Sequence, residues 1–256
     1  MQKTAPPSFC LAEAKEIILT AFSNFDPLLG QRAQNIFAAG YGYNSALKGL
    51  WNDKARYFAD VAIREQDARH LAALETGTRW RLANVKPGQA FMMRSRPAQT
   101  PASAQGDPAS PHDYAVIDYQ FDGSLNGVVY MAHEVGHAIA DDCIHAYGKS
   151  YNDSPHEIDE VQGYLPQLVV YNHLGGHPNP RIAEAAQQHR ADLMAKTTGG
   201  RGAALKAAQT IFELAQDKSK RAAIIETLMG ARGPKNIAET IAAGCRVPSK
   251  AVKLSI

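Results

Sequence analysis

The chain has 256 residues, 45% of them hydrophobic, which is long enough for a single domain with a substantial core. Lys and Arg number 27 and Asp and Glu 25, so the net charge of +2 gives no reason to expect a nucleic acid or an anionic membrane as partner. The three cysteines contain no CxxC pair and are too few for a disulfide framework, which favours a reducing compartment.

The first residues, MQKTAPPSFCLAEAKEIILTAF, interrupt their apolar run with Glu13, Lys15 and Glu16, which is untypical of a secretory signal. No stretch of the sequence has the roughly eighteen apolar residues of a membrane span. We therefore expect a cytoplasmic protein, although export into another cell by a signal-free route would leave the same pattern.

Apolar residues at helical spacing predict helices in the first third of the chain. We expect one helix over residues 12–22, ended by the extended dipeptide Asp26-Pro27, and a second that reaches about residue 39. A longer helix is expected over residues 45–74.

Residues 77–121 alternate apolar and polar side chains and predict a small β-sheet. Helical patterns then return with a helix over about 125–147, for which Ser124 is a good N-cap, and another over about 157–174. Because the sequence contains no internal repeat, we expect a single domain over residues 1–256.

The helix expected over 125–147 contains the run His-Glu-Val-Gly-His at residues 133 to 137. On a helix, His133 and His137 lie one turn apart on the same face, so both imidazoles can reach one ion. A catalytic zinc takes a third protein ligand and keeps one position for water, and Glu134 stands beside the histidines as a general base for that water. The motif therefore predicts a zinc site with Glu134 as the catalytic residue.

The third ligand separates the classes of zinc peptidase. The metzincin pattern requires Gly and His three and six residues after His137, where this chain has Ala140 and Cys143. That class is excluded, and a glutamate on the next predicted helix is left. Glu157 and Glu160 are both candidates, since they share one face of that helix.

Metal-bound histidines usually donate their second ring proton to a neighbouring acceptor. Asp141 lies one turn beyond His137 and is a candidate for that acceptor. The alternative is that Asp141 is a solvated helix residue.

The run DYAVIDYQFDGSLNGVVYMAHEVGHAIAD joins a strand, a short Gly-Ser turn and a helix to the histidine motif. It resembles the corresponding segment of the oligoendopeptidase F and thimet oligopeptidase family of gluzincin metallopeptidases. Three further runs are similar to a strand, a preceding helical segment and a closing helix of that family: KPGQAFMM, AFSNFDPLLGQRAQNIF and LMGARGPKNIAETIAAGCRV. The resemblance is strong at residues 113–140 and weaker elsewhere.

This resemblance implies a zincin-like catalytic domain that is mostly α with a small β-sheet at the active-site cleft. The family's third ligand is a glutamate whose surroundings match Glu160-Val161-Gln162-Gly163 better than the run from Glu157, with Gly163 in place of a small serine. The resemblance therefore implies one zinc ion per chain, held by His133, His137 and Glu160.

The chain departs from the family in length. It is less than half as long as family members usually are, and the missing part corresponds to the helical region that walls a channel and restricts substrates to short peptides. This departure predicts a more open cleft that also accepts protein substrates.

A second departure concerns the group that binds the substrate carbonyl. The family carries a His and a pair of tyrosines for this purpose far downstream, but the last tyrosine here is Tyr171. The segment YNHLGGHPNP is similar to the family's His before a Gly-rich loop, which implies His173 and His177 as substrate-binding residues. The alternative is a surface turn with two solvated histidines. In that case the role returns to an upstream tyrosine: Tyr147, Tyr151 or Tyr164.

The sequence thus predicts a zinc metalloendopeptidase that hydrolyses peptide bonds in peptides or a protein substrate by metal-activated water. The alternative is a peptidase-like binding protein that holds the metal but has lost turnover together with the tyrosines. The expected partner is a peptide or protein substrate, without nucleic acid or membrane, and the oligomeric state is left open.

Overall fold

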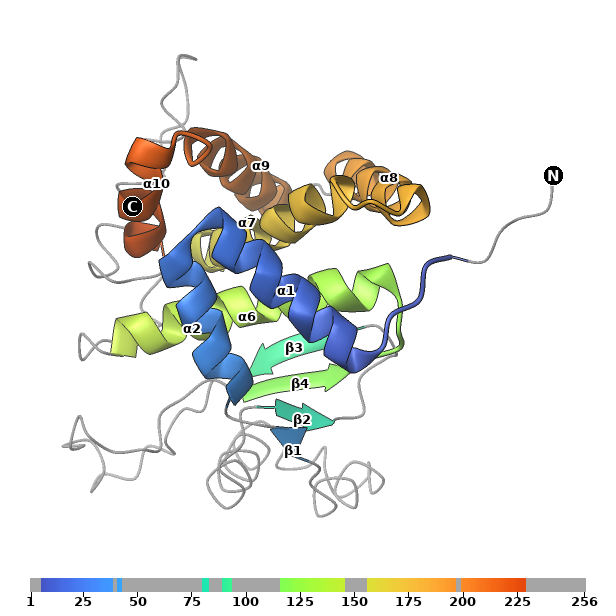
Figure 1. Cartoon of the computed structure of the whole chain (residues 1–256). Coiled ribbons are helices and arrows are strands. Elements are labelled where there is room, and N and C mark those ends of the chain that lie inside the picture. The colour runs from blue at the N-terminus through green and yellow to red at the C-terminus, as the bar shows by residue number, and fades with distance from the viewer. Residues whose placement is uncertain are drawn as a thin grey trace.

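The computed structural model describes residues 6–38, 41–42, 80–82, 89–93, 116–145, 156–196 and 199–228 (Figure 1). In parts of these ranges, including 141–145 and 156–159, it describes the backbone alone. The described helices are α1 (Leu11–Phe25), α2 (Pro27–Ala38), α6 (Leu125–His145), α7 (His156–Gly175), α8 (Pro180–Lys196), α9 (Gly199–Leu214) and α10 (Lys218–Leu228). The described strands are β1 (Tyr41–Gly42), β2 (Trp80–Leu82), β3 (Gln89–Met93) and β4 (Val116–Gln120). The helix predicted over residues 45–74 lies outside the described residues.

Local signals set the ends of the first two helices. Cys10 and Glu13 form a capping box at the start of α1, in which the Glu13 carboxylate accepts a hydrogen bond from the Cys10 N–H (2.6 Å). Asp26 caps α2, because its Oδ1 accepts hydrogen bonds from two N–H groups of the first turn. The helix break predicted at Asp26-Pro27 is therefore confirmed.

The strands form one sheet in the order β1-β2-β4-β3. β1 pairs with β2 and β2 with β4 in parallel, with Trp80 opposite Ile117. β3 pairs with β4 in the antiparallel direction, with Phe91 opposite Asp118.

The prediction of a fold with a small β-sheet at the active-site cleft is wrong. The described structure is helical: its helices are 11 to 21 residues long, whereas the strands have only two to five residues. The alternating pattern over residues 77–121 overstated the sheet, because the strands are short and the described core forms mainly between helices. The side chains of the candidate site described below come from helices alone.

Helix α7 lies at the centre of the helical body, where it packs against α1, α6, α8 and α9 (Figure 1). Every residue from 161 to 171 is buried, as expected of a helix that is covered on all sides. Helix α6 packs against α7 and also against β3 and β4. None of the described helices is both long and apolar enough to cross a lipid bilayer.

The first and last described helices meet at Phe25. Arg221 of α10 donates a hydrogen bond from Nη1 to the Phe25 carbonyl oxygen (2.6 Å), and its guanidinium lies 4.7 Å from the centroid of the Phe25 ring. The Phe25 ring also stacks on Phe212 of α9, with ring centroids 5.6 Å apart. Helix α1 is thereby joined to α9 and α10.

Candidate metal centre

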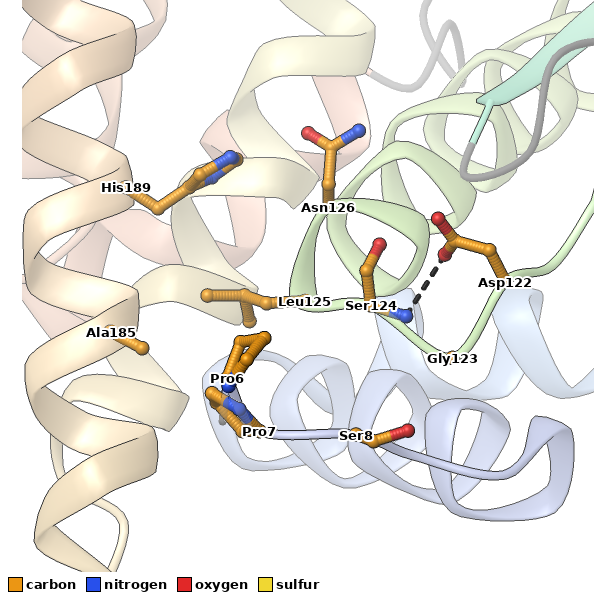
Figure 2. Close-up of a pocket in the computed structure, with 10 residues that line it drawn as sticks. All are labelled: Pro6, Pro7, Ser8, Asp122, Gly123, Ser124, Leu125, Asn126, Ala185 and His189. Atoms are coloured by element: carbon orange, nitrogen blue, oxygen red, sulfur yellow. Dashed lines mark hydrogen bonds between the residues drawn. The ribbon is translucent and has the colours of Figure 1, made fainter. Parts of the chain in front are cut away.

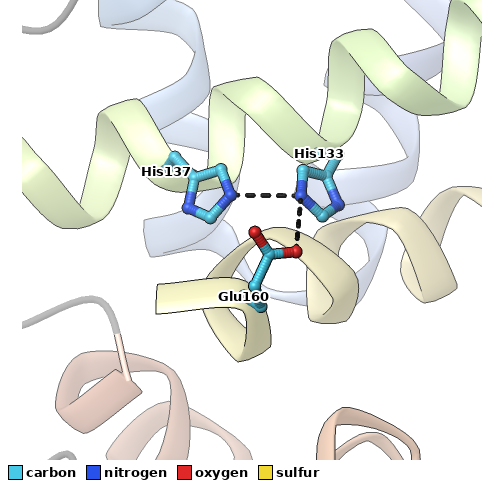
Figure 3. Close-up of side chains that lie close together, drawn as sticks. All are labelled: His133, His137 and Glu160. Atoms are coloured by element: carbon cyan, nitrogen blue, oxygen red, sulfur yellow. Dashed lines mark hydrogen bonds and ion pairs between the residues drawn. The ribbon is translucent and has the colours of Figure 1, made fainter. Parts of the chain in front are cut away.

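Two histidines of α6 point toward the same place near the middle of the helix (Figure 3). The helix begins after Ser124, whose Oγ accepts a hydrogen bond from the Gly127 N–H (3.0 Å), so the predicted N-cap is confirmed. His133 and His137 lie one turn apart, and their Nε2 atoms are 3.1 Å from each other. Both side chains are buried, with 7% of each residue exposed.

Helix α7 brings a carboxylate to the same place (Figure 3). Glu160 Oε2 lies 3.8 Å from His133 Nε2, and the ligand atoms of His133, His137 and Glu160 are all within 4.8 Å of one another. Two imidazole nitrogens and a carboxylate oxygen at such separations could hold a metal ion. The structure thus brings together the three residues predicted as ligands. The side chain of the other candidate, Glu157, lies outside the described residues.

Two glycines allow α6 and α7 to approach closely enough for these groups to meet. A Cβ atom on Gly136 would lie 2.4 Å from the backbone oxygen of Gln162 and 2.6 Å from Cγ of Pro166. A Cβ atom on Gly163 would lie 2.4 Å from Nε2 of His133. Glycine at position 163 therefore makes room for the imidazole ring.

Gln167 sets the orientation of the His133 ring. The amide Oε1 of Gln167 lies 3.1 Å from Nδ1 of His133, and Gln167 is 3% exposed. Because an amide oxygen only accepts hydrogen bonds, Nδ1 carries the proton and Nε2 presents its lone pair to His137 and Glu160. This tautomer is the one that can bind a metal ion through Nε2.

Burial is the largest influence on the pKa of His133 and lowers it from its ordinary value. The Glu160 carboxylate and the hydrogen bond to Gln167 act in the opposite direction, and Arg201, near the start of α9, lowers the pKa of His133 further. The lowered pKa keeps the imidazole neutral near neutral pH, and the neutral form is the one that binds metal ions.

Glu134 follows His133 in α6 and is also buried, with 8% of the residue exposed. A helix turns by about 100° per residue, so Glu134 projects about 100° from His133 and about 60° from His137. Glu134 therefore starts on the flank of the helix face that carries both histidines, on the side of His137.

Tyr164 of α7 packs against His133. The two rings meet edge to face, with centroids 5.0 Å apart. Burial, followed by the neighbouring Glu160 carboxylate, raises the pKa of Tyr164 to about 12. The phenol is therefore protonated at neutral pH and can donate a hydrogen bond beside the cluster.

The structure does not bring His173 and His177 to this cluster. Helix α7 is continuous from His156 to Gly175, so His173 lies thirteen residues beyond Glu160, or about 20 Å along the helix axis. His177 follows the end of the helix, where its Nδ1 accepts a hydrogen bond from the Asn179 N–H (3.0 Å). Neither histidine therefore lies at this centre in the structure, and their role in binding substrate stays a prediction.

Gln167 was not among the predicted residues. Its signal in the sequence is a single polar side chain in the apolar run YLPQLVVY, seven residues after Glu160. The spacing places Gln167 two turns along the same helix, where it lies on the face of Glu160.

The side chain of Asp141, proposed as a partner of His137, lies outside the described residues. Tyr147 and Tyr151 lie outside them as well, so Tyr164 is the described member of the three candidate tyrosines.

Comparisons with models of protein families, with curated proteins and with solved structures find no match for this chain. The chemistry open to the centre follows from its own groups. Two imidazoles and a carboxylate could hold a cation, while the buried carboxylate of Glu134 and the phenol of Tyr164 could move or donate protons beside it.

Proposed function

We propose that this chain is a zinc metalloendopeptidase of the glutamate-ligand class that hydrolyses peptide bonds in peptides or in a protein substrate. On this proposal it is a shortened relative of the oligoendopeptidase F and thimet oligopeptidase family. The observation that carries the proposal is the meeting of His133, His137 and Glu160 from two helices, with the buried Glu134 next to the first of them.

The donor atoms suit zinc. Ligand atoms at usual zinc distances in a tetrahedral arrangement lie roughly 3.3–3.6 Å from one another. The distances here fall on either side of that range, at 3.1 Å between the two Nε2 atoms and 3.8 Å from His133 Nε2 to Glu160 Oε2. Two histidines and one carboxylate leave the fourth position of such an ion for water. We therefore propose one zinc ion per chain.

Each residue of the centre would have a separate role in hydrolysis. A bound zinc ion would lower the pKa of a water molecule and polarise the peptide carbonyl. Glu134 would accept a proton from that water during the attack and then deliver it to the departing amine. Because Glu134 is buried, little solvent weakens its interaction with the proton. His133 would remain neutral, because burial lowers its pKa, and Gln167 would hold its ring in place.

We assign the stabilisation of the developing negative charge to Tyr164 in place of His173 and His177. A preorganised donor to the carbonyl oxygen contributes roughly 3–4 kcal/mol to the transition state. Two observations support Tyr164: its pKa is raised to about 12, which keeps the proton on the phenol, and its ring contacts His133.

For the compartment we propose the cytoplasm. The thiol of Cys10 is free and exposed, and exposed free thiols persist in reducing environments.

The proposal is tested by digestion of casein and of labelled peptides with the purified full-length chain, in parallel with Glu134→Gln. The parent protein should cleave, while Glu134→Gln should fold, keep its zinc and lose activity by about two to four decades. Equal cleavage by both proteins contradicts the mechanism. Zinc binding by the parent without any cleavage favours the peptidase-like binding protein instead.

A further inference from the structure

A chain of hydrogen bonds leads from His133 through the helical core to α8. The first joins Nδ1 of His133 to Oε1 of Gln167 (3.1 Å). The second joins the side chain of Gln167 to the hydroxyl of Tyr171, one turn further along α7. The third joins Oη of Tyr171 to Nδ1 of His189 (2.5 Å). The four side chains come from three different helices, which this chain of hydrogen bonds ties together.

The middle members of the chain are buried among apolar side chains. Gln167 is 3% exposed and Tyr171 is 2% exposed. Polar groups this deeply buried are costly unless they are hydrogen-bonded, so the bonds between them are held in place by the surrounding core. Burial raises the pKa of Tyr171, and the hydrogen bond from Gln167 lowers it by less, so the hydroxyl keeps its proton.

The orientation of the Gln167 amide gives the chain of hydrogen bonds one direction, because its Oε1 faces His133 and its nitrogen is left for Tyr171. The Tyr171 oxygen then accepts from the amide nitrogen of Gln167, and its hydroxyl proton is donated to Nδ1 of His189. At the other end, the amide oxygen of Gln167 accepts from Nδ1–H of His133. A reversed amide would turn its N–H groups toward Nδ1 and require the proton of His133 on Nε2, the atom that faces Glu160.

The far end of the chain lies at the molecular surface. His189 is half-buried and lines a cavity of about 380 Å³ between α8 and the start of α6. Figure 2 shows His189 on one wall of this cavity and Ser124 and Asn126 on the facing wall. A substitution at His189 therefore removes the surface end of the chain of hydrogen bonds and opens no cavity in the core.

We propose that Gln167, Tyr171 and His189 are positioning residues that hold His133 in the Nδ1–H tautomer, so that Nε2 is always ready to bind the metal ion. This inference rests on the proposed zinc site. Gln167 acts on His133 directly, Tyr171 acts by fixing the Gln167 amide, and His189 acts by fixing the Tyr171 hydroxyl. The expected consequence lies in metal affinity, because partners of metal-bound histidines typically change it by about 10- to 100-fold.

The test measures the zinc affinity of the full-length chain by competition with a chromophoric chelator, together with the visible spectrum of the Co²⁺ form. Gln167→Leu removes both polar atoms at nearly constant volume and should weaken zinc binding by about 10- to 100-fold. Gln167→Glu keeps an acceptor for Nδ1–H and should restore most of the affinity and the parental Co²⁺ spectrum. Tyr171→Phe and His189→Leu should weaken binding by smaller factors, in that order.

Gln162→Leu is the matched control. It removes another buried amide from α7, and Gln162 projects about 200° round the helix from Glu160. Its zinc affinity should equal that of the parent. A loss in Gln162→Leu equal to that in Gln167→Leu would overturn the proposal, because any buried polar substitution in α7 would then have the same effect.

His133→Ala separates this proposal from the zinc site on which it rests. If His133→Ala loses zinc while folded Gln167→Leu keeps the parental affinity, the role of the hydrogen-bond chain is overturned and the zinc site stands. Parental affinity in His133→Ala overturns both. Should Gln167→Leu fail to fold, the ¹⁵N shifts of His133 test the proposal instead. They report the ring tautomer in the metal-free parent and in Tyr171→Phe. A proton on Nε2 in the parent, or an unchanged ring tautomer and unchanged affinity in Tyr171→Phe, overturns the proposal.

Discussion

The ring of His133 fills the space that any side chain at position 163 would need, since a Cβ atom on Gly163 would lie 2.4 Å from its Nε2 and 2.5 Å from its Cε1. The backbone of α7 therefore supports the imidazole directly, and the position of this ring depends on how closely the two helices cross.

We expect Gly163→Ala to displace His133 and to weaken zinc binding about tenfold or more, an effect at least as large as that of losing a hydrogen-bond partner of a ligand. Overpacking should also lower the free energy of unfolding of the metal-free protein by about 1–3 kcal/mol. Chelator competition and urea unfolding measure the two effects. The control is Gly175→Ala on the same helix, where the nearest atom to the new Cβ is 3.7 Å away. Parental zinc affinity in Gly163→Ala would show that the ring does not depend on this contact.

The ligand assignment predicts an order of zinc loss among single variants. Glu160→Gln should lose most of the bound zinc, because its carboxylate oxygen lies 3.8 Å from His133 Nε2 and an amide is a poorer ligand. Glu157→Gln should retain zinc. Metal analysis of the purified proteins checks both, and the reverse order would transfer the role of third ligand to Glu157.

Tyr164→Phe should lower kcat by about 10²- to 10³-fold and change KM little, because the lost hydrogen bond would form mainly in the transition state. The phenyl ring keeps the contact with His133, so zinc content should stay at the parental level. His173→Ala is the control, since its side chain starts about 20 Å from Glu160 along the axis of α7. Parental kcat in Tyr164→Phe combined with a low kcat in His173→Ala would return the role to the histidine.

Burial of His133 makes the stability of the metal-free protein depend on pH. Its pKa in the folded chain lies below its ordinary value of about 6.5, so the unfolded chain binds the proton more readily than the folded chain. The free energy of unfolding contributed by neutral His133 is therefore fully present above about pH 6.5 and is lost as the pH falls from there through the folded pKa. Urea unfolding at about pH 7.5 and about pH 5.5 measures this loss. His133→Gln should show a smaller loss, and an identical loss in both proteins would contradict this account.

Several elements could be predicted because short-range signals set them. Ser124 caps α6 through its own hydroxyl, and Asp26 ends one helix and caps the next. The pairing of His133 with His137 also follows from helical spacing alone. The choice of Glu160 over Glu157 depended on a resemblance of the surrounding residues, because both positions lie on one face of α7.

Other features could not be predicted because they depend on how helices cross. Gln167 and Tyr164 meet His133 only because α6 and α7 pack with glycines at their contact, and no local pattern encodes that geometry. The position of His173 relative to the centre also depends on tertiary structure: α7 continues past Pro166 to Gly175 and carries His173 away from Glu160. The sheet was overstated because alternation in short runs does not measure how much surface a strand buries.

The contact between Arg221 and Phe25 joins residues that are 196 positions apart. A ribosome that adds 5 to 20 residues per second needs roughly ten to forty seconds to make the chain between them. During that interval Phe25 has emerged without the ring of Phe212 or the guanidinium of Arg221 that later cover it. The first of the described helices is therefore completed by the last two, and a product that stalls before α10 would present an apolar helix end to chaperones and proteases.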